Sequence, residues 1–329
     1  MHQATLLRRL ATAALLLGLV VTLTFVLVRL APGDPSAFLI APGASEADAA
    51  RLRAELGLDR SMLVQYARWV GATLRGDLGT SFATGLPVAR ILAEAAPISI
   101  LLGGASLALT FLVGVPVGML QAARRGRASD TVLTVLTTAV YAAPTFWLAL
   151  ALVAVFTYGA ASLGLPAALR LPAFGVRTPG LTLEGWAGFV DVVRHAVLPV
   201  TILAAVGAAG IARYARSSVA DVLRLDFVRT AYAKGLGSGR VFSRHVLANV
   251  LPPLVVLFAL SLPGLLAGSI FVESVFAWPG LGRATLGAIL ARDYPVVMGA
   301  TLFYATAVIG ANLAAELVLP LLDPRREKA

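Results

Sequence analysis

Residues that could carry out chemistry are sparse in this sequence of 329 residues. Its three histidines, His2, His195 and His245, cannot form a zinc site with one another at any standard ligand spacing. The sequence holds no cysteine, which excludes disulfides, cysteine-ligated zinc, iron–sulfur clusters and thiol nucleophiles. It also lacks the Gly-x-Ser-x-Gly pattern that exposes a nucleophilic serine on a sharp turn. We therefore expect neither a metal site nor a catalytic centre.

The only two lysines, Lys234 and Lys328, exclude ATP hydrolysis through a phosphate-binding loop. Neither is preceded by glycine and followed by serine or threonine, as a phosphate-binding loop requires. We expect ATP and Mg²⁺ to be bound by partner subunits, with no cofactor in this chain. Glu316 is the sole ionisable group within the long apolar runs, which makes it a candidate functional residue. The alternative is a structural role, in which it lies near the inner end of its run and its carboxylate reaches water or caps a helix pair.

The elements that hold these residues must be largely embedded in a membrane. Hydrophobic residues make up 58% of the chain and charged residues only 13%, and its mean hydropathy is +0.85. A soluble domain of this size has about twice that charged share. The net charge of +10 would suggest nucleic acid in a soluble protein, whereas in a membrane protein it is typical of basic cytoplasmic loops.

Six apolar runs are long enough to cross about 30 Å of hydrocarbon. They predict an all-α membrane protein with spans at 10–28, 96–120, 131–158, 196–212, 250–272 and 296–322. An even number of spans puts both termini on one side. Nearly all of the excess positive charge then lies on that side, so the positive-inside rule makes the termini cytoplasmic. No bound nucleic acid is expected.

The segment 29–95 between the first two spans is predicted to be an extracytoplasmic helical segment. Ser45 offers an N-cap before the acidic Glu46 and Asp48. Helical periodicity resumes over 59–74, with Leu63, Tyr66, Ala67 and Val70 on one face. The glycines in 75–79 indicate a turn.

The inner connection 213–249 is strongly basic. Residues 216–234 are predicted to be helical, the glycines from Gly235 to Gly239 interrupt them, and 242–247 form a second short helix. Such a loop can serve only to fix topology. The alternation of helix, glycine break and short helix indicates instead a docking surface.

Residues 226–236 resemble the signature loop of the inner-membrane permease subunits of ABC importers, most closely the first permease of the dipeptide/oligopeptide branch. Further matches to that branch occur in order along nearly the whole chain: Ala31-Pro32-Gly33-Asp34-Pro35, Leu56-Gly57-Leu58-Asp59, Gly76-Asp77-Leu78-Gly79-Thr80-Ser81, Ala143-Pro144-Thr145-Phe146-Trp147, His195-Ala196-Val197-Leu198-Pro199, Val275-Phe276-Ala277-Trp278-Pro279-Gly280-Leu281-Gly282 and Arg292-Asp293-Tyr294-Pro295.

The resemblance implies a transport subunit that is not itself an enzyme, in the bacterial cytoplasmic (inner) membrane. It would form half of a pathway for peptides with a second, homologous permease, while two ABC ATPases bind below and an extracytoplasmic solute-binding protein delivers the solute. The loop 213–249 would couple the spans to an ATPase. The candidate coupling residues are Arg229, Thr230, Ala231, Lys234, Gly235, Leu236, Arg240, Arg244, His245 and Leu247. Of the general importer signature only Ala231, Gly235 and Leu247 match, and Arg229 stands where that signature has glutamate.

Phe146, Trp147, Phe276 and Trp278 are candidates for the solute pathway or its outer gate, and they could equally serve packing or an interfacial aromatic belt. Permeases for nickel, glutathione or metal–opine complexes look similar, so these substrates remain an alternative to peptides. A secondary transporter would favour inverted repeats and paired charges within the membrane, and a membrane-embedded enzyme would need a polar cluster. Neither pattern is found in the sequence.

Overall fold

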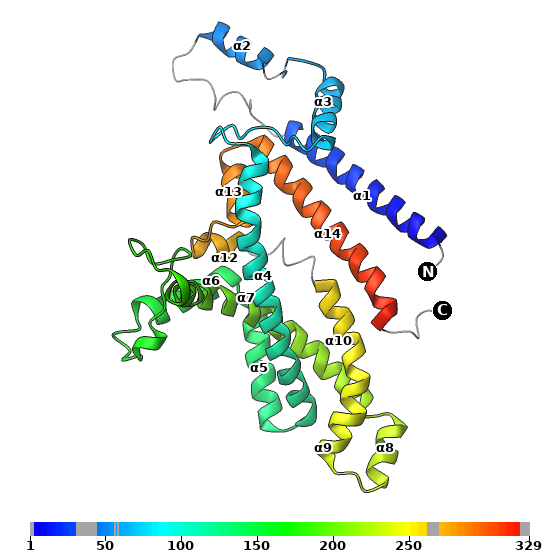
Figure 1. Ribbon diagram of the computed structural model, residues 1–329. Helices are drawn as coiled ribbons and strands as arrows, with labels where there is room; N and C mark the ends of the chain where they lie inside the picture. Colours follow the sequence, from blue (N-terminus) through cyan, green and yellow to red (C-terminus); the bar gives the residue numbers. More distant parts are fainter. Residues whose placement is uncertain (1–2, 31–44, 56, 58, 262–269, 323–329) are drawn as a thin grey trace. The chain divides into compact units, whose positions relative to one another are not determined.

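The computed structural model describes residues 3–30, 45–55, 57, 59–261 and 270–322, and every named element in them is helical (Figure 1). The helices are α1 (Gln3–Leu30), α2 (Glu46–Glu55), α3 (Met62–Leu74), α4 (Val88–Ala123), α5 (Ala128–Ala142), α6 (Thr145–Val153), η2 (Ala154–Tyr158), η3 (Ala167–Leu169), α7 (Gly185–Val222), α8 (Asp226–Ala233), α9 (Ser238–Val241), η4 (Phe242–Val246), α10 (Leu247–Ser261), α12 (Ile270–Val275), α13 (Leu281–Leu290) and α14 (Tyr294–Leu322). The chain forms two compact units. Unit 1 holds Met1–Ser99 and Pro279–Leu313, and unit 2 holds Ile100–Trp278 and Ala314–Ala329.

Five helices of the described residues are long and apolar enough to cross a membrane. They are Leu7–Leu30, Val88–Ala123, Gly185–Val222, Ser238–Ser261 and Tyr294–Ala314. The pair formed by α5 and α6 with η2 makes a sixth if it is counted as one span. The all-helical membrane architecture predicted from the sequence is thus confirmed.

Two of the predicted spans differ from the helices observed. The run 131–158 is bent by 103° between α5 and α6. The bend falls at Ala143, which Pro144 forces into the extended region (ψ 140°). The helix near the predicted span 250–272 begins at Ser238, and residues 262–269 of that span lie outside the described residues.

Unit 1 contains the predicted outer segment. The Ser45 cap is confirmed: the Ser45 Oγ accepts the Asp48 N–H (3.2 Å) and donates to the Asp48 carboxylate (2.7 Å). Helix α3 packs on α1 through Tyr66, and the turn that follows α3 uses positive φ at Gly76 and Gly79, as predicted (82° and 80°). The core of the unit joins the start of α4 to α13 and to the start of α14. It comprises Val88, Leu92, Ala95, Ala96, Leu281, Ala288, Val296 and Ala300.

Unit 2 is built around close contact between α4 and α7. A Cβ added at Gly118 would lie 2.2 Å from the carbonyl oxygen of Ala212, so only glycine allows this approach. Helix α5 also packs on α7. At the end that carries α8 and α9, a second core joins α4, α7, α8 and the Ser238–Ser261 helix. This core supports the candidate site.

Candidate functional site

Helix α8 is a separate element rather than the continuation of α7. The prediction of one helical stretch over 216–234 is wrong: α7 ends at Val222, and Leu225 has an extended backbone (ψ 146°). Neither glycine nor proline marks the break. Asp226 favours a new helix start here, because a carboxylate in the first turn interacts favourably with the helix dipole. The chain can therefore turn and lay α8 against the core.

One face of α8 is buried and the other is exposed. Val228 and Ala231 are 1% and 4% exposed and pack in the core with Val219, Val241 and Val246. The aromatic rings of Phe227 and Tyr232, which flank this buried face, are 39% and 45% exposed, and Arg229 and Thr230 are exposed on the opposite side. The inner face fixes α8 to unit 2, and the outer face is available to a partner.

Gly235 ends α8 in the left-handed region, with φ +76°. This conformation is costly for any residue with a Cβ. A Cβ added at Gly235 would meet no atom of this chain within 4 Å, so the turn itself, and not packing inside the chain, requires glycine. The predicted helix stop at Gly235 is confirmed.

The predicted coupling residues differ in how exposed their side chains are. Arg229, Thr230, Lys234, Gly235, Arg240 and Arg244 are exposed, and Leu236, His245 and Leu247 are partly buried. Ala231, in contrast, is a core residue of this chain. The sequence predicts a separate short helix over residues 242–247. In the structure they lie inside the Ser238–Ser261 helix, and Phe242–Val246 form a π-helical turn within it.

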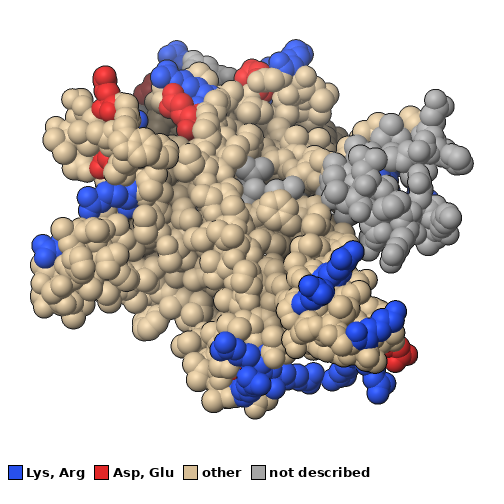
Figure 2. All heavy atoms as spheres, turned by 60° about the horizontal axis from the view of Figure 1, so that its bottom comes forward, with Lys and Arg blue, Asp and Glu red and all other residues tan. Residues whose placement is uncertain are grey.

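Basic side chains gather at this end of unit 2. Figure 2 views it with the lower end of Figure 1 forward and shows several Lys and Arg groups close together there. The exposed basic residues of α8, α9 and the neighbouring connections are Arg124, Arg125, Arg127, Arg224, Arg229, Lys234, Arg240 and Arg244. Asp226 pairs with Arg229 at 3.7 Å, and both side chains are exposed. The surface is suited to a partner with acidic groups at the contact.

A polar tie behind this surface was missed by the sequence reasoning. Arg216 on α7 donates two hydrogen bonds to the buried Asp130 at the start of α5, at 3.1 and 2.8 Å. Asp130 also accepts the Gly126 N–H, which closes the α4–α5 turn. Arg213, one turn earlier on α7, lies 3.8 Å from the centre of the Tyr141 ring. These contacts fix α5 to the end of α7 that precedes α8.

The four aromatic pathway candidates lie in unit 2 but differ in burial. Phe146 and Trp147, at the start of α6, are 49% and 58% exposed. Phe276 and Trp278 are 0% and 1% exposed. The backbone N–H of Trp278 donates to the Glu273 carbonyl, and Ala277 between the two aromatic residues has φ 54°. Phe276 and Trp278 are thus buried in this structure, whereas Phe146 and Trp147 are exposed.

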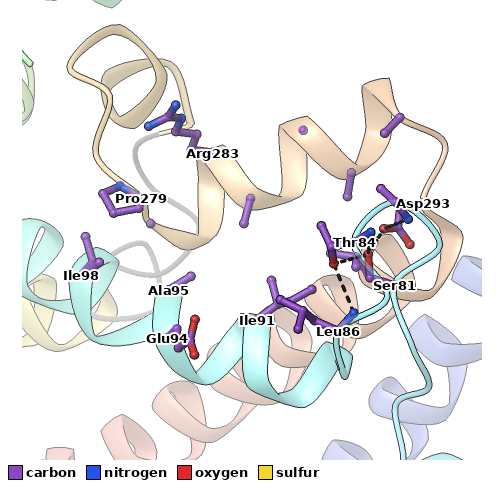
Figure 3. Close-up of a pocket in the computed structure, with 17 residues that line it drawn as sticks. Ser81, Thr84, Leu86, Ile91, Glu94, Ala95, Ile98, Pro279, Arg283 and Asp293 are labelled. Carbon is purple, nitrogen blue, oxygen red and sulfur yellow. Dashed lines mark hydrogen bonds between the residues drawn. The ribbon is translucent and has the colours of Figure 1, made fainter. Parts of the chain in front are cut away.

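Unit 1 contains a groove of about 590 Å³ between α4, α13 and the loop before α4 (Figure 3). Its walls are mainly small and apolar, with Ile91, Ala95 and Ala284 among them. The buried Asp293 closes one end, accepting hydrogen bonds from the Ser81 hydroxyl and from the Phe82 and Ala83 N–H groups. This carboxylate anchors the loop.

No group of three or more histidine, aspartate or glutamate residues that could hold a metal was found among the residues described. The Glu316 side chain lies outside those described. The long apolar helices and the basic surface at one end are the features of a multi-pass membrane protein.

Comparison with known proteins gives the family. Residues 114–328 match the model of the binding-protein-dependent transport system inner membrane component, and residues 2–103 match the model of its N-terminal part. The chain is 36% identical over 321 residues to the oligopeptide transport system permease protein AppB of Bacillus subtilis, covering 97% of this chain and 98% of that protein. It is also 36% identical over 313 residues to the dipeptide transport system permease protein DppB of Escherichia coli K12, covering 92% of each.

The chain therefore belongs to the family of binding-protein-dependent transport system inner membrane components. It is a multi-pass inner-membrane permease component, and the resemblance seen in the sequence is confirmed.

Proposed function

We propose that this chain forms half of the translocation pathway of an ATP-driven peptide importer. A second, homologous permease supplies the other half, two ABC ATPases bind at the cytoplasmic side, and an extracytoplasmic solute-binding protein delivers the peptide. The assignment to peptides is supported by the relatives named as oligopeptide and dipeptide permeases. ATP and Mg²⁺ are bound by the ATPases, and this chain has no ATPase site.

The observation that carries the proposal is the construction of α8. Its inner face is fixed in the core by Val228 and Ala231, and its outer face is exposed and ends at the positive φ of Gly235. A helix anchored in this way moves with unit 2 as a rigid body, so closure of the ATPases can be passed to α7 and α4. We assign the coupling role to 213–249, with Arg229, Thr230, Lys234, Gly235, Arg240 and Arg244 in contact with the ATPase.

The membrane arrangement is part of this proposal. Six spans, with the bent α5–α6 pair counted as one, leave both termini and the α8 surface in the cytoplasm and 29–95 outside. The excess of basic residues around α8 supports this orientation.

Reconstitution tests the function. The permease pair, ATPases and binding protein in liposomes should import a labelled dipeptide or tripeptide only when ATP is supplied to the ATPase side. The purified chain alone should hydrolyse no ATP. Hydrolysis by the chain alone, or import without ATPases, would overturn the assignment.

A further inference from the structure

Helix α3 carries an apolar stripe, Leu63, Ala67 and Leu74, that none of the described residues of unit 1 covers, whereas Val70 on the same face is partly buried. Leu63 and Leu74 are 81% and 83% exposed, and Ala67 between them is also exposed. The two leucines are eleven positions apart, about three helical turns, so their side chains share one face. Two largely exposed leucines on one face of a short helix favour an apolar environment.

The position of α3 is fixed by contacts with α1. The Phe25 ring stacks on Trp69 at 5.8 Å and meets Tyr66 edge-on at 5.3 Å, and the Tyr66 hydroxyl is hydrogen-bonded to that of Thr22 at 2.7 Å. Phe25 is 2% exposed. Thr22 lies about 12 Å before the end of α1 at Leu30, at 1.5 Å per residue. Because α1 is long and apolar enough to span the membrane, these contacts hold α3 beside its last turns (Figure 1).

The charges of α3 lie away from the stripe. Arg68 is exposed and lies about 120–140° around the helix axis from Leu63 and Leu74, at about 100° per residue. Arg60 and Arg75 flank the two ends and are also exposed. An apolar face, an arginine on another face, flanking arginines and aromatic residues at the boundary are the features of a helix that lies in a membrane interface.

We propose that α3 lies in the membrane interface at the Leu30 end of α1, with Leu63, Ala67 and Leu74 inserted among phospholipid acyl chains and Arg68 in the headgroup region. The inference depends on α1 spanning the membrane and not on the transported solute. Phospholipid is the favoured occupant because α1, which holds α3 through Phe25, itself exposes large apolar side chains near the same end, with Leu27 66% and Leu30 70% exposed.

Single-cysteine reporters can test this, because the natural chain contains no cysteine. Leu63→Cys, Leu74→Cys and Arg68→Cys would be labelled with an environment-sensitive fluorophore in the full chain, in nanodiscs of phosphatidylethanolamine and phosphatidylglycerol. Leu27→Cys serves as the membrane reference. Quenching by a doxyl lipid labelled near the headgroup would be compared with quenching by aqueous iodide.

Reporters at 63 and 74 should resemble the reporter at 27, with at least twofold more quenching by doxyl lipid and at least twofold less by iodide than at 68. Iodide quenching at 63 and 74 equal to that at 68 would show a solvated cap and overturn the proposal. Shielding of 63 and 74 from both quenchers would show that protein covers the stripe, and would overturn it as well.

Discussion

At the scale of single residues, Gly235 is the most specific position of the coupling surface. Replacing it with valine imposes a β-branched side chain at φ +76°, which costs about 1–2 kcal/mol and reduces the population of the native turn by about five- to thirtyfold. The Gly235→Val protein should reach the membrane at the normal level but lose most ATPase association and peptide-stimulated hydrolysis. Co-purification with the ATPases and ATPase rates in liposomes measure this.

Gly237 provides the matched control, because it lies in the same loop with φ −65°, which any residue can adopt. A Cβ added at Gly237 would also meet no atom within 4 Å. Gly237→Val should retain both properties, and Lys328→Ala should be silent. Wild-type transport in Gly235→Val would remove the coupling role assigned to this turn.

Asp293 is the second residue whose environment defines its role. It is 2% exposed and accepts three hydrogen bonds from the loop before α4. Asp293→Ala leaves those donors without a partner, at a cost of about 1–3 kcal/mol, so thermal unfolding in detergent should shift to lower temperature.

Asp77→Ala removes an exposed carboxylate that accepts one bond, from the Gly79 N–H, and should shift the transition less. Equal shifts for Asp77→Ala and Asp293→Ala would contradict the anchoring role of Asp293.

At the scale of elements, the α5–α7 tie should behave as a coupled pair. Asp130→Asn leaves Arg216 facing a weaker acceptor, and Arg216→Gln leaves a buried carboxylate without its counterion. Each single change should lower the melting temperature, and the double variant should lower it by less than the sum of the two. Strictly additive shifts would mean that the two residues act independently.

At this scale, the features that could be predicted from the sequence are those set by a local residue type. The Ser45 cap, the turn with Gly76 and Gly79 and the helix stop at Gly235 each have a residue type that fixes the local backbone. The bend at Ala143 also had a local signal in Pro144, which the length of the apolar run obscured.

The remainder depends on contacts distant in sequence. Arg216 meets Asp130 across 86 residues and Ser81 meets Asp293 across 212, and no spacing rule links such positions. The break after Val222 contains neither glycine nor proline, so no local signal predicts it. The packing of Val228 and Ala231 in the core makes α8 a separate helix. Likewise, the burial of Phe276 and Trp278 depends on the folded chain and has no local sequence signal.

At the scale of the whole molecule, the bent α5–α6 pair decides the topology. If it crosses the membrane, the α4–α5 turn and the connection after η2 lie on opposite sides. If it enters and leaves by one side, both connections lie together and the termini fall on opposite sides. The basic residues on the α4–α5 turn favour a cytoplasmic location for that turn, so we expect the first arrangement.

Cysteine labelling separates the two arrangements in intact cells. Arg125→Cys and Ser162→Cys place single thiols on exposed positions of the two connections, and Ser238→Cys marks the coupling loop. A membrane-impermeant maleimide added outside should label position 162 alone, and positions 125 and 238 should react only after the cells are opened. Labelling of 125 together with 162 from outside, or protection of both, would show that the pair does not cross. External labelling of position 238 would place α8 away from any cytoplasmic ATPase and remove the basis of the coupling proposal.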